Sequence, residues 1–182
     1  MTKATTLPQQ ITIAGAGTQG SMLAFRSAFY GRTVRVYDLS NSALDTAEKK
    51  IKGWLEGRVK QNFLSDSDVN SILNHLLFTS DLAHALEDTE LIIENVPEKL
   101  TLKQSVWEEI DRIAQPQALL TTNSSSLKSS DIGKNVRRKD KTFNINFMTP
   151  TEDDLVEVMW NSSTSDETKE KALTFLKAQK NI

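Results

Sequence analysis

The sequence predicts an α/β fold built on one doubly wound, mostly parallel β-sheet. Two observations lead to this expectation. Short β-branched or apolar runs alternate with helix-like segments along most of the 182 residues, and a glycine-rich turn directly follows the first of these runs. Parallel strands need long crossovers that are usually helical, so the alternation favours a sheet covered on both faces. A chain of this length holds one well-buried domain, which we expect to span residues 1–182.

The first elements follow from residue type and spacing. Residues 10–14 and 33–38 are β-branched runs beside glycines and predict two strands, with a helix over 22–30 between them. Apolar residues then recur twice at helical spacing, and the segment SDSD offers N-caps between the two runs. We therefore expect a helical pair over about 42–76, inserted after the second strand.

The rest of the chain continues the alternation. The expected elements are a strand at 76–80, a helix at 81–87, a strand at 91–96, a helix at 102–113, a strand at 118–124, and strands at 143–148 and 155–160. A polar segment, 161–171, then leads into a helix-like segment, 172–179. Such a helix normally leads into another strand or domain, so we expect the chain to be part of a longer protein.

The composition argues against several kinds of partner. The formal net charge of -2 gives no electrostatic reason to expect nucleic acid. Without cysteine there are no disulfides or thiolate metal sites, and two histidines, His75 and His84, leave little for a metal. The first ten residues lack the apolar core of a signal peptide, and no apolar run approaches the ~18 residues of a membrane span. We expect a cytoplasmic protein without a membrane partner.

A glycine motif follows the first predicted strand. Gly15, Gly17 and Gly20 have the spacing GxGxxG. In this context the first glycine takes a tight turn, the second leaves room for a pyrophosphate, and the third lets helix and strand pack closely. The amides at the start of the helix, where Thr18 and Gln19 lie, favour an anion. The alternative is a glycine-rich turn without a ligand.

Asp38 ends the second predicted strand. An acidic side chain at this position accepts hydrogen bonds from the adenosine ribose hydroxyls and repels a 2′-phosphate. Together with the glycine motif it predicts a Rossmann-type fold that binds NAD rather than NADP. The alternative is that Asp38 caps the following helix together with Ser40 or Ser42.

With these residues in place, nearly the whole chain resembles the NAD-binding domain of 3-hydroxyacyl-CoA dehydrogenases. The resemblance rests on the order of the glycine loop, the helical pair, IIENVPEKLTLK, TTNSSSL and LVEV. This ordered combination is much more specific than the glycine loop alone. It implies an NAD-dependent oxidoreductase of fatty-acid metabolism that oxidises L-3-hydroxyacyl-CoA.

The resemblance also implies roles for individual residues. Glu98, Lys103 and Asn123 match the cofactor site, and Ser125 matches the serine that contacts the substrate's 3-oxygen. Its position at the carboxyl end of a parallel strand favours a ligand role. The alternatives are that the two charged residues are ordinary charges at a helix start, and that the serines at 124–126 are N-caps for the helix in KSSDI.

The catalytic pair of the resembled family is altered here. That family uses a histidine as general base, oriented by a glutamate. Glu157 matches the glutamate, but Asn146 stands at the histidine position and Thr149 replaces the usual asparagine. The loop before LVEV is one residue shorter and has acidic residues at 152–154. An amide donates a hydrogen bond but takes no proton near neutral pH, and losing a positioned base costs roughly 10² to 10⁴ in rate.

Three functional hypotheses remain open on these grounds. The first is an oxidoreductase in which Ser125 and Asn146 hold the substrate oxygen and Glu157 or a loop acid handles the proton. The second is an NAD(H)-binding module that lost its base and serves as a sensor or partner subunit. The third is the cofactor half of a two-domain enzyme, because the resembled family has a following helical domain that forms a homodimer interface and part of the acyl-CoA pocket.

Overall fold

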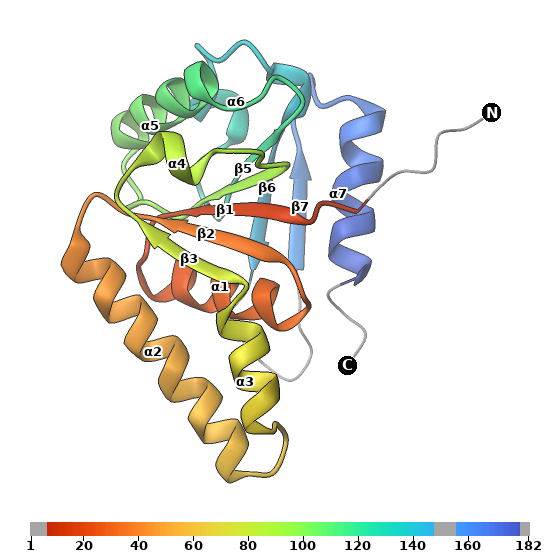
Figure 1. Ribbon diagram of the computed structural model, residues 1–182. Coiled ribbons are helices and arrows are strands. Elements are labelled where there is room, and N and C mark those ends of the chain that lie inside the picture. The colour runs from red at the N-terminus through yellow and green to blue at the C-terminus, as the bar shows by residue number, and fades with distance from the viewer. Residues whose placement is uncertain (1–6, 148–155, 179–182) are drawn as a thin grey trace.

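The protein forms one seven-stranded sheet between two layers of helices (Figure 1). The structure is a computed structural model and describes residues 7–147 and 156–178. The strands are β1 (Gln10–Ala14), β2 (Thr33–Tyr37), β3 (Leu76–Thr79), β4 (Leu91–Glu94), β5 (Leu119–Thr122), β6 (Thr142–Phe147) and β7 (Val156–Trp160). In the described part of the chain, no helix is long and apolar enough to cross a membrane.

The strand order is β3-β2-β1-β4-β5-β6-β7. The first six strands are parallel, and β7 runs antiparallel to β6 at the edge. The chain winds outward from β1 through β2 and β3, and then returns to β4 on the other side of β1. The expected doubly wound, mostly parallel sheet is confirmed. Its switch point lies between β1 and β4, where such sheets bind ligands beyond the carboxyl ends of the strands.

The crossovers are helical. The helices are α1 (Thr18–Phe29), α2 (Asn41–Lys60), α3 (Asp66–Leu73), α4 (Leu82–Ala85), α5 (Leu100–Ile113), α6 (Ser129–Ile132), a 3-10 turn η1 (Lys139–Lys141) and α7 (Asp166–Ala178). Two hydrophobic clusters separate the helices by face. One joins the sheet to α1, α2, α3 and α7, and the other joins it to α4, α5 and α6. Burial on both faces explains why the central strands are almost continuously apolar.

The helical pair follows the second strand as expected, with different bounds. Ser40 caps α2, and Ser65 caps α3 in a reciprocal capping box with Asp68, so the N-cap expected in SDSD is confirmed. The pair ends earlier than expected because Leu76 is the first residue of β3, which pairs with β2. The two helices therefore form the crossover from β2 to β3, and their far ends extend beyond the sheet (Figure 1).

Two helices begin several residues before their apolar residues indicate. The first begins at Thr18 instead of residue 22, and the last begins at Asp166 instead of residue 172. The polar segment 161–171 therefore contains the first turns of α7. Both starts are polar, and an apolar pattern marks only the part of a helix that packs on the core.

Candidate functional site

Two glycines of the loop between β1 and α1 are required by packing. Gly15 has φ +114°, and a Cβ there would lie 2.7 Å from the carbonyl oxygen of Asn95. A Cβ on Gly20 would lie 1.8 Å from the carbonyl oxygen of Gly15. The expected tight turn at the first position and the close approach at the third are therefore confirmed. Gly15 lets the loop lie against the segment that follows β4, and Gly20 lets α1 lie against the loop.

Gly17 differs from Gly15 and Gly20 because, apart from its chain neighbours and its own helix, no atom of the described residues would lie within 4 Å of a Cβ there. It is the N-cap of α1, which has neither a side-chain cap nor an acidic residue in its first turn. Gly17 and Thr18 are exposed and Gln19 is half-buried. In contrast, serine or aspartate side chains cap α2, α3 and α4. An open helix N-terminus beside a glycine fits an anionic group such as a pyrophosphate.

Asp38 connects the end of β2 to the glycine loop. One carboxylate oxygen accepts the amide hydrogen of Ala16 at 2.9 Å, and the other accepts that of Ser40 at 2.9 Å. The N-cap of α2 is Ser40, whose hydroxyl accepts from the amide of Ala43. In the alternative that Asp38 caps this helix together with Ser40 or Ser42, the cap by Ser40 is therefore confirmed, whereas Asp38 is not the N-cap. Its half-buried carboxylate keeps acceptor capacity at the carboxyl edge of the sheet.

Lys103 and Glu94 form a buried ion pair at the carboxyl end of β4. Lys103 is 1% exposed, and its Nζ donates to Glu94 Oε1 at 2.7 Å and to the Val96 carbonyl at 3.1 Å. It also lies 3.3 Å from Glu98 Oε2. The alternative of an ordinary helix-start charge is wrong for Lys103, because such a charge would face solvent. Burial raises the pKa of Glu94 against the opposing effects of Lys103 and Thr122.

Glu98 is hydrogen-bonded to the loop after β5 that carries Ser124, Ser125 and Ser126, which we call the serine loop. Its Oε1 accepts hydrogen bonds from the hydroxyls of Ser124 and Ser126. Burial opposes ionisation of Glu98, but these hydrogen bonds and the charge of Lys103 outweigh it and lower its pKa. The carboxylate is therefore ionised at neutral pH and joins the start of α5 to the loop.

The expected N-caps for the helix in KSSDI are wrong. The N-cap of α6 is Lys128, without a side-chain hydrogen bond. The hydroxyl of Ser124 instead accepts the amides of Ser126 and Leu127, at 3.3 Å and 2.8 Å, within the preceding turn. Ser125 is exposed, and its side chain has no hydrogen bond within the described residues. The turn thus holds Ser125 toward solvent at the carboxyl end of β5.

Asn123 joins three strand ends. Its amide oxygen accepts the backbone amide of Phe147 at 2.9 Å, and its amide nitrogen donates to Asn95 Oδ1 at 2.9 Å. Asn123 follows β5, Phe147 ends β6 and Asn95 follows β4, so the contact aligns the three strands beside the switch point. Both polar atoms of Asn123 have protein partners.

Asn144 supports the site and was not recognised in the sequence. It is 3% exposed, accepts the Ser129 amide at 2.8 Å, and donates to the carbonyls of Ser124 and Leu127. It therefore fixes the serine loop from β6. The alternation in FNINFM puts Asn144 and Asn146 on one face of the strand. A buried polar residue two positions from Asn146 was the available signal.

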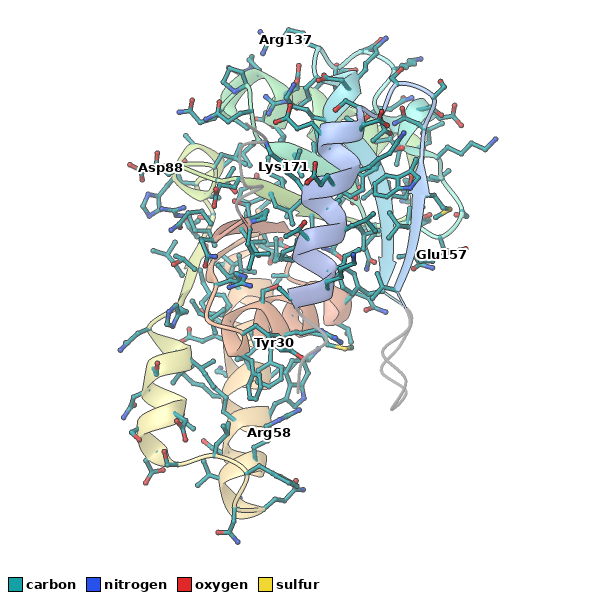
Figure 2. All side chains as sticks on the ribbon, turned by 90° about the vertical axis from the view of Figure 1, so that its right-hand side faces the viewer. Tyr30, Arg58, Asp88, Arg137, Glu157 and Lys171 are labelled. Atoms are coloured by element: carbon teal, nitrogen blue, oxygen red, sulfur yellow. The ribbon has the colours of Figure 1, made fainter. Side chains whose placement is uncertain are left out.

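Asn146 and Glu157 are direct partners across β6 and β7. Asn146 Nδ2 lies 3.5 Å from Glu157 Oε2, a long contact between a half-buried amide and an exposed carboxylate. Figure 2 shows Glu157 near the start of β7. The expected substitutions at Thr149 and at 152–154 lie outside the described residues. Neither histidine is here, because His75 contacts Ser71 and His84 contacts Glu87.

A switch point that has a glycine loop, an open helix start and a strand-end acid defines a dinucleotide-binding domain. Comparison with known families identifies one family. The model of the family described as 3-hydroxyacyl-CoA dehydrogenase, NAD binding domain, matches residues 10–182. The chain belongs to this family, and the match identifies NAD as its cofactor.

Individual relatives agree with the family. A probable 3-hydroxyacyl-CoA dehydrogenase of Caenorhabditis elegans is 33% identical over 87% of this chain and 53% of its own length. A probable 3-hydroxybutyryl-CoA dehydrogenase of Bacillus subtilis is 32% identical over 88% of this chain and 56% of its length. The solved 3-hydroxybutyryl-CoA dehydrogenase of Escherichia coli K12 has a TM-score of 0.90 at 29% identity, over 96% of this chain and 37% of that one. The chain spans about half the length of the two curated relatives named here.

Proposed function

We propose that this chain is the cofactor-binding part of an NAD-dependent oxidoreductase that interconverts 3-hydroxyacyl-CoA and 3-oxoacyl-CoA in fatty-acid metabolism. The observation that carries the proposal is Gly17, where the protein leaves open space at an uncapped helix start on the sheet edge that also bears Asn146 and Glu157. NAD, when bound, supplies the hydride acceptor. The rest of the chemistry must come from side chains.

The cofactor half of the site has separate groups for separate parts of NAD. The amides around Gly17, Thr18 and Gln19 would hold the pyrophosphate. The carboxylate of Asp38 would accept hydrogen bonds from the ribose hydroxyls. Glu98 and Asn123 border the nicotinamide half. Lys103 acts through Glu98, because its ammonium already has partners at Glu94, Val96 and Glu98.

The substrate half uses Ser125, Asn146 and Glu157. The exposed hydroxyl of Ser125 and the amide of Asn146 donate hydrogen bonds to the 3-oxygen of the substrate. Glu157 accepts the hydroxyl proton as hydride leaves, in place of the family's histidine. The acyl-CoA pocket and a homodimer interface belong, in this proposal, to a helical domain outside the chain. The absence of cysteine supports a place in the cytoplasm.

A calorimetric titration of the folded chain with NADH and, separately, NADPH tests the cofactor half. We expect micromolar binding of NADH and much weaker binding of NADPH, because Asp38 faces the ribose hydroxyls. If neither binds to a chain whose folding has been checked by circular dichroism, the proposed function fails.

A second candidate is an NAD(H)-binding module without turnover, which acts as a sensor or a partner subunit. It is favoured by Asn146, because an amide has no accessible pKa for proton removal. Turnover of acetoacetyl-CoA and NADH by the full-length protein decides between the two functions. Substrate-dependent NADH oxidation that disappears in Glu157→Gln supports the enzyme, and binding without any turnover supports the module.

A further inference from the structure

Glu94 is the most deeply enclosed charge beside the proposed nicotinamide site. It ends β4 and is 0% exposed. Its Oε1 accepts from the Val96 amide and the Lys103 ammonium, both at 2.7 Å, and its Oε2 accepts from the Thr122 hydroxyl at 2.8 Å. Each partner lies on a different segment: the loop after β4, α5 and β5. The carboxylate therefore joins three segments from inside the protein.

Two routes lead from Glu94 to the serine loop. In the first, Lys103 also lies 3.3 Å from Glu98, which accepts the hydroxyls of Ser124 and Ser126. In the second, the Thr122 hydroxyl that donates to Glu94 accepts the amide of Ser124 at 3.2 Å. A change at Glu94 is thus transmitted to the loop through both a charge and a neutral hydrogen bond.

This network lies on one side of the switch point only. Asp38 follows β2, on the far side of β1, whereas Glu94 and Thr122 end β4 and β5. A dinucleotide lies across the switch point, so its adenosine half faces Asp38 and its nicotinamide half faces the ends of β4 and β5. The two halves of the cofactor can therefore be tested separately.

We propose that Glu94 is a positioning residue for the nicotinamide half of the cofactor, which it serves by holding Glu98 and the serine loop in one arrangement through Lys103 and Thr122. A buried ion pair adds little net stability, because desolvation offsets most of the attraction. What it fixes is geometry, since each of its donors and acceptors has one direction. This inference rests on the proposed NAD binding.

The variant Glu94→Gln keeps the size of the side chain and removes its charge. We expect the Kd for NADH to rise by roughly tenfold, the equivalent of about one misplaced hydrogen bond. The Kd for ADP, which lacks the nicotinamide half, should stay within about twofold. General loosening of the fold would weaken both ligands. Both constants are measured by calorimetry at a temperature at which circular dichroism shows the variant folded.

Asp111→Asn is the matched control. Asp111 is also a buried carboxylate, 5% exposed, and it is held by Arg137 and Arg138. Figure 2 shows Arg137 at the top of the view and Glu157 well below it, near the start of β7. We expect this variant to bind NADH and ADP like the wild type. If Glu94→Gln does not fold, Thr122→Val removes one of its hydrogen bonds and should shift NADH binding in the same direction by a smaller factor.

Three results overturn the inference. Unchanged NADH affinity in the folded Glu94→Gln variant overturns it alone, as does equal weakening of NADH and ADP. Absence of NADH binding by the wild type overturns the proposed function and this inference together. Selective loss of NADH affinity in Glu94→Gln, with neither ligand affected in Asp111→Asn, supports it.

Discussion

Asn146 determines which chemistry the proposed substrate site can perform. Its amide lies beside the exposed carboxylate of Glu157, and both residues are at the carboxyl edge of the sheet. An amide there orients the substrate oxygen but leaves proton transfer to another group. Among the described residues, Glu157 is the acidic side chain paired with that position across β6 and β7.

Asn146→His should raise turnover of acetoacetyl-CoA with NADH by roughly 10² or more, because a positioned base or acid contributes about that factor. The imidazole would lie opposite Glu157, which can orient it across the strand pair. The measurement is steady-state kcat at neutral pH on the full-length protein. Asn146→Gln, which lengthens the side chain without adding a titratable group, is the control and should give no gain.

An unchanged kcat in Asn146→His, alongside efficient turnover by the wild type, would show that Glu157 or another group already does the work of the base. The second candidate function would then be excluded as well. Loss of the gain in the double variant Asn146→His and Glu157→Gln would show that the two residues act as a pair.

Asp38 should control the choice between NADH and NADPH. In Asp38→Asn the amide oxygen can still accept one of the backbone hydrogen bonds from Ala16 and Ser40, but the charge that repels a 2′-phosphate is gone. We expect the Kd for NADPH to fall at least tenfold, since like charges a few ångströms apart cost more than the 1.4 kcal/mol of one decade. Asp66→Asn, an equal charge change on α3, is the control and should leave the Kd for NADH and the Kd for NADPH unchanged.

The sequence predicts some residue roles here and not others, for a physical reason. Gly15, Gly20 and Asp38 are set by local backbone geometry, so a motif specifies them. Glu94 and Asn144 act through partners that are distant along the chain, such as Thr122 and Ser129, and no local pattern contains those contacts. A buried polar residue within an apolar strand is the signal that remains.

In the glycine loop and α1, packing requires one glycine, Gly20, and the proposed ligand requires another, Gly17. Gly20→Ala should lower the free energy of unfolding by roughly 3 kcal/mol, because the new Cβ would overlap the Gly15 carbonyl. Gly17→Ala should cost less than about 1 kcal/mol, because a Cβ there meets no protein atom and φ of -66° suits alanine. Urea unfolding of each variant checks both values.

For cofactor binding, Gly17→Ala is the variant of the two that should have the direct effect. Gly17→Ala should raise the Kd for NADH at least tenfold, since the methyl group would occupy the space proposed for the pyrophosphate. Wild-type NADH affinity in Gly17→Ala would contradict the phosphate site at α1. Gly53→Ala, at a position in α2 where a Cβ also meets nothing, is the control and should bind like the wild type.

Element order was predictable from the sequence, and element starts were less so. Every expected strand of the described chain is present, because each buries an apolar or alternating run. The early starts of α1 and α7 were missed because their first turns are polar, and α4 is only four residues long although its pattern indicated seven. Helix ends are set by caps and by what the helix faces, which a hydrophobic period does not record.

The proposed cofactor site and the buried Asp111 network lie at opposite edges of the sheet. The carboxyl edge carries the glycine loop, Glu98 and the serine loop. The amino edge carries Asp111, which binds Arg137 and Arg138, while Arg138 also donates to carbonyls at the end of α5. A change at the amino edge is therefore expected to alter stability without altering ligand affinity.

The pH dependence of stability should reveal this network. Burial opposes ionisation of Asp111, but its hydrogen bonds with Arg137 and Arg138 outweigh burial and lower its pKa. A depressed folded-state pKa gives stability that is present above the unfolded pKa of about 4 and is lost as the pH falls through the folded pKa. Asp111→Asn should therefore lower the free energy of unfolding by about 3 kcal/mol at pH 7, and by progressively less below about pH 4.

The measurement is urea unfolding of wild type and Asp111→Asn between pH 7 and the lowest pH at which both refold reversibly. Other titrating groups cancel in the difference because both proteins contain them. Glu109→Gln, at an exposed position of the same helix, is the control and should stay within about 0.5 kcal/mol of wild type at every pH. A difference for Asp111→Asn that stays constant with pH would contradict the prediction, because packing rather than the carboxylate charge would then account for the loss.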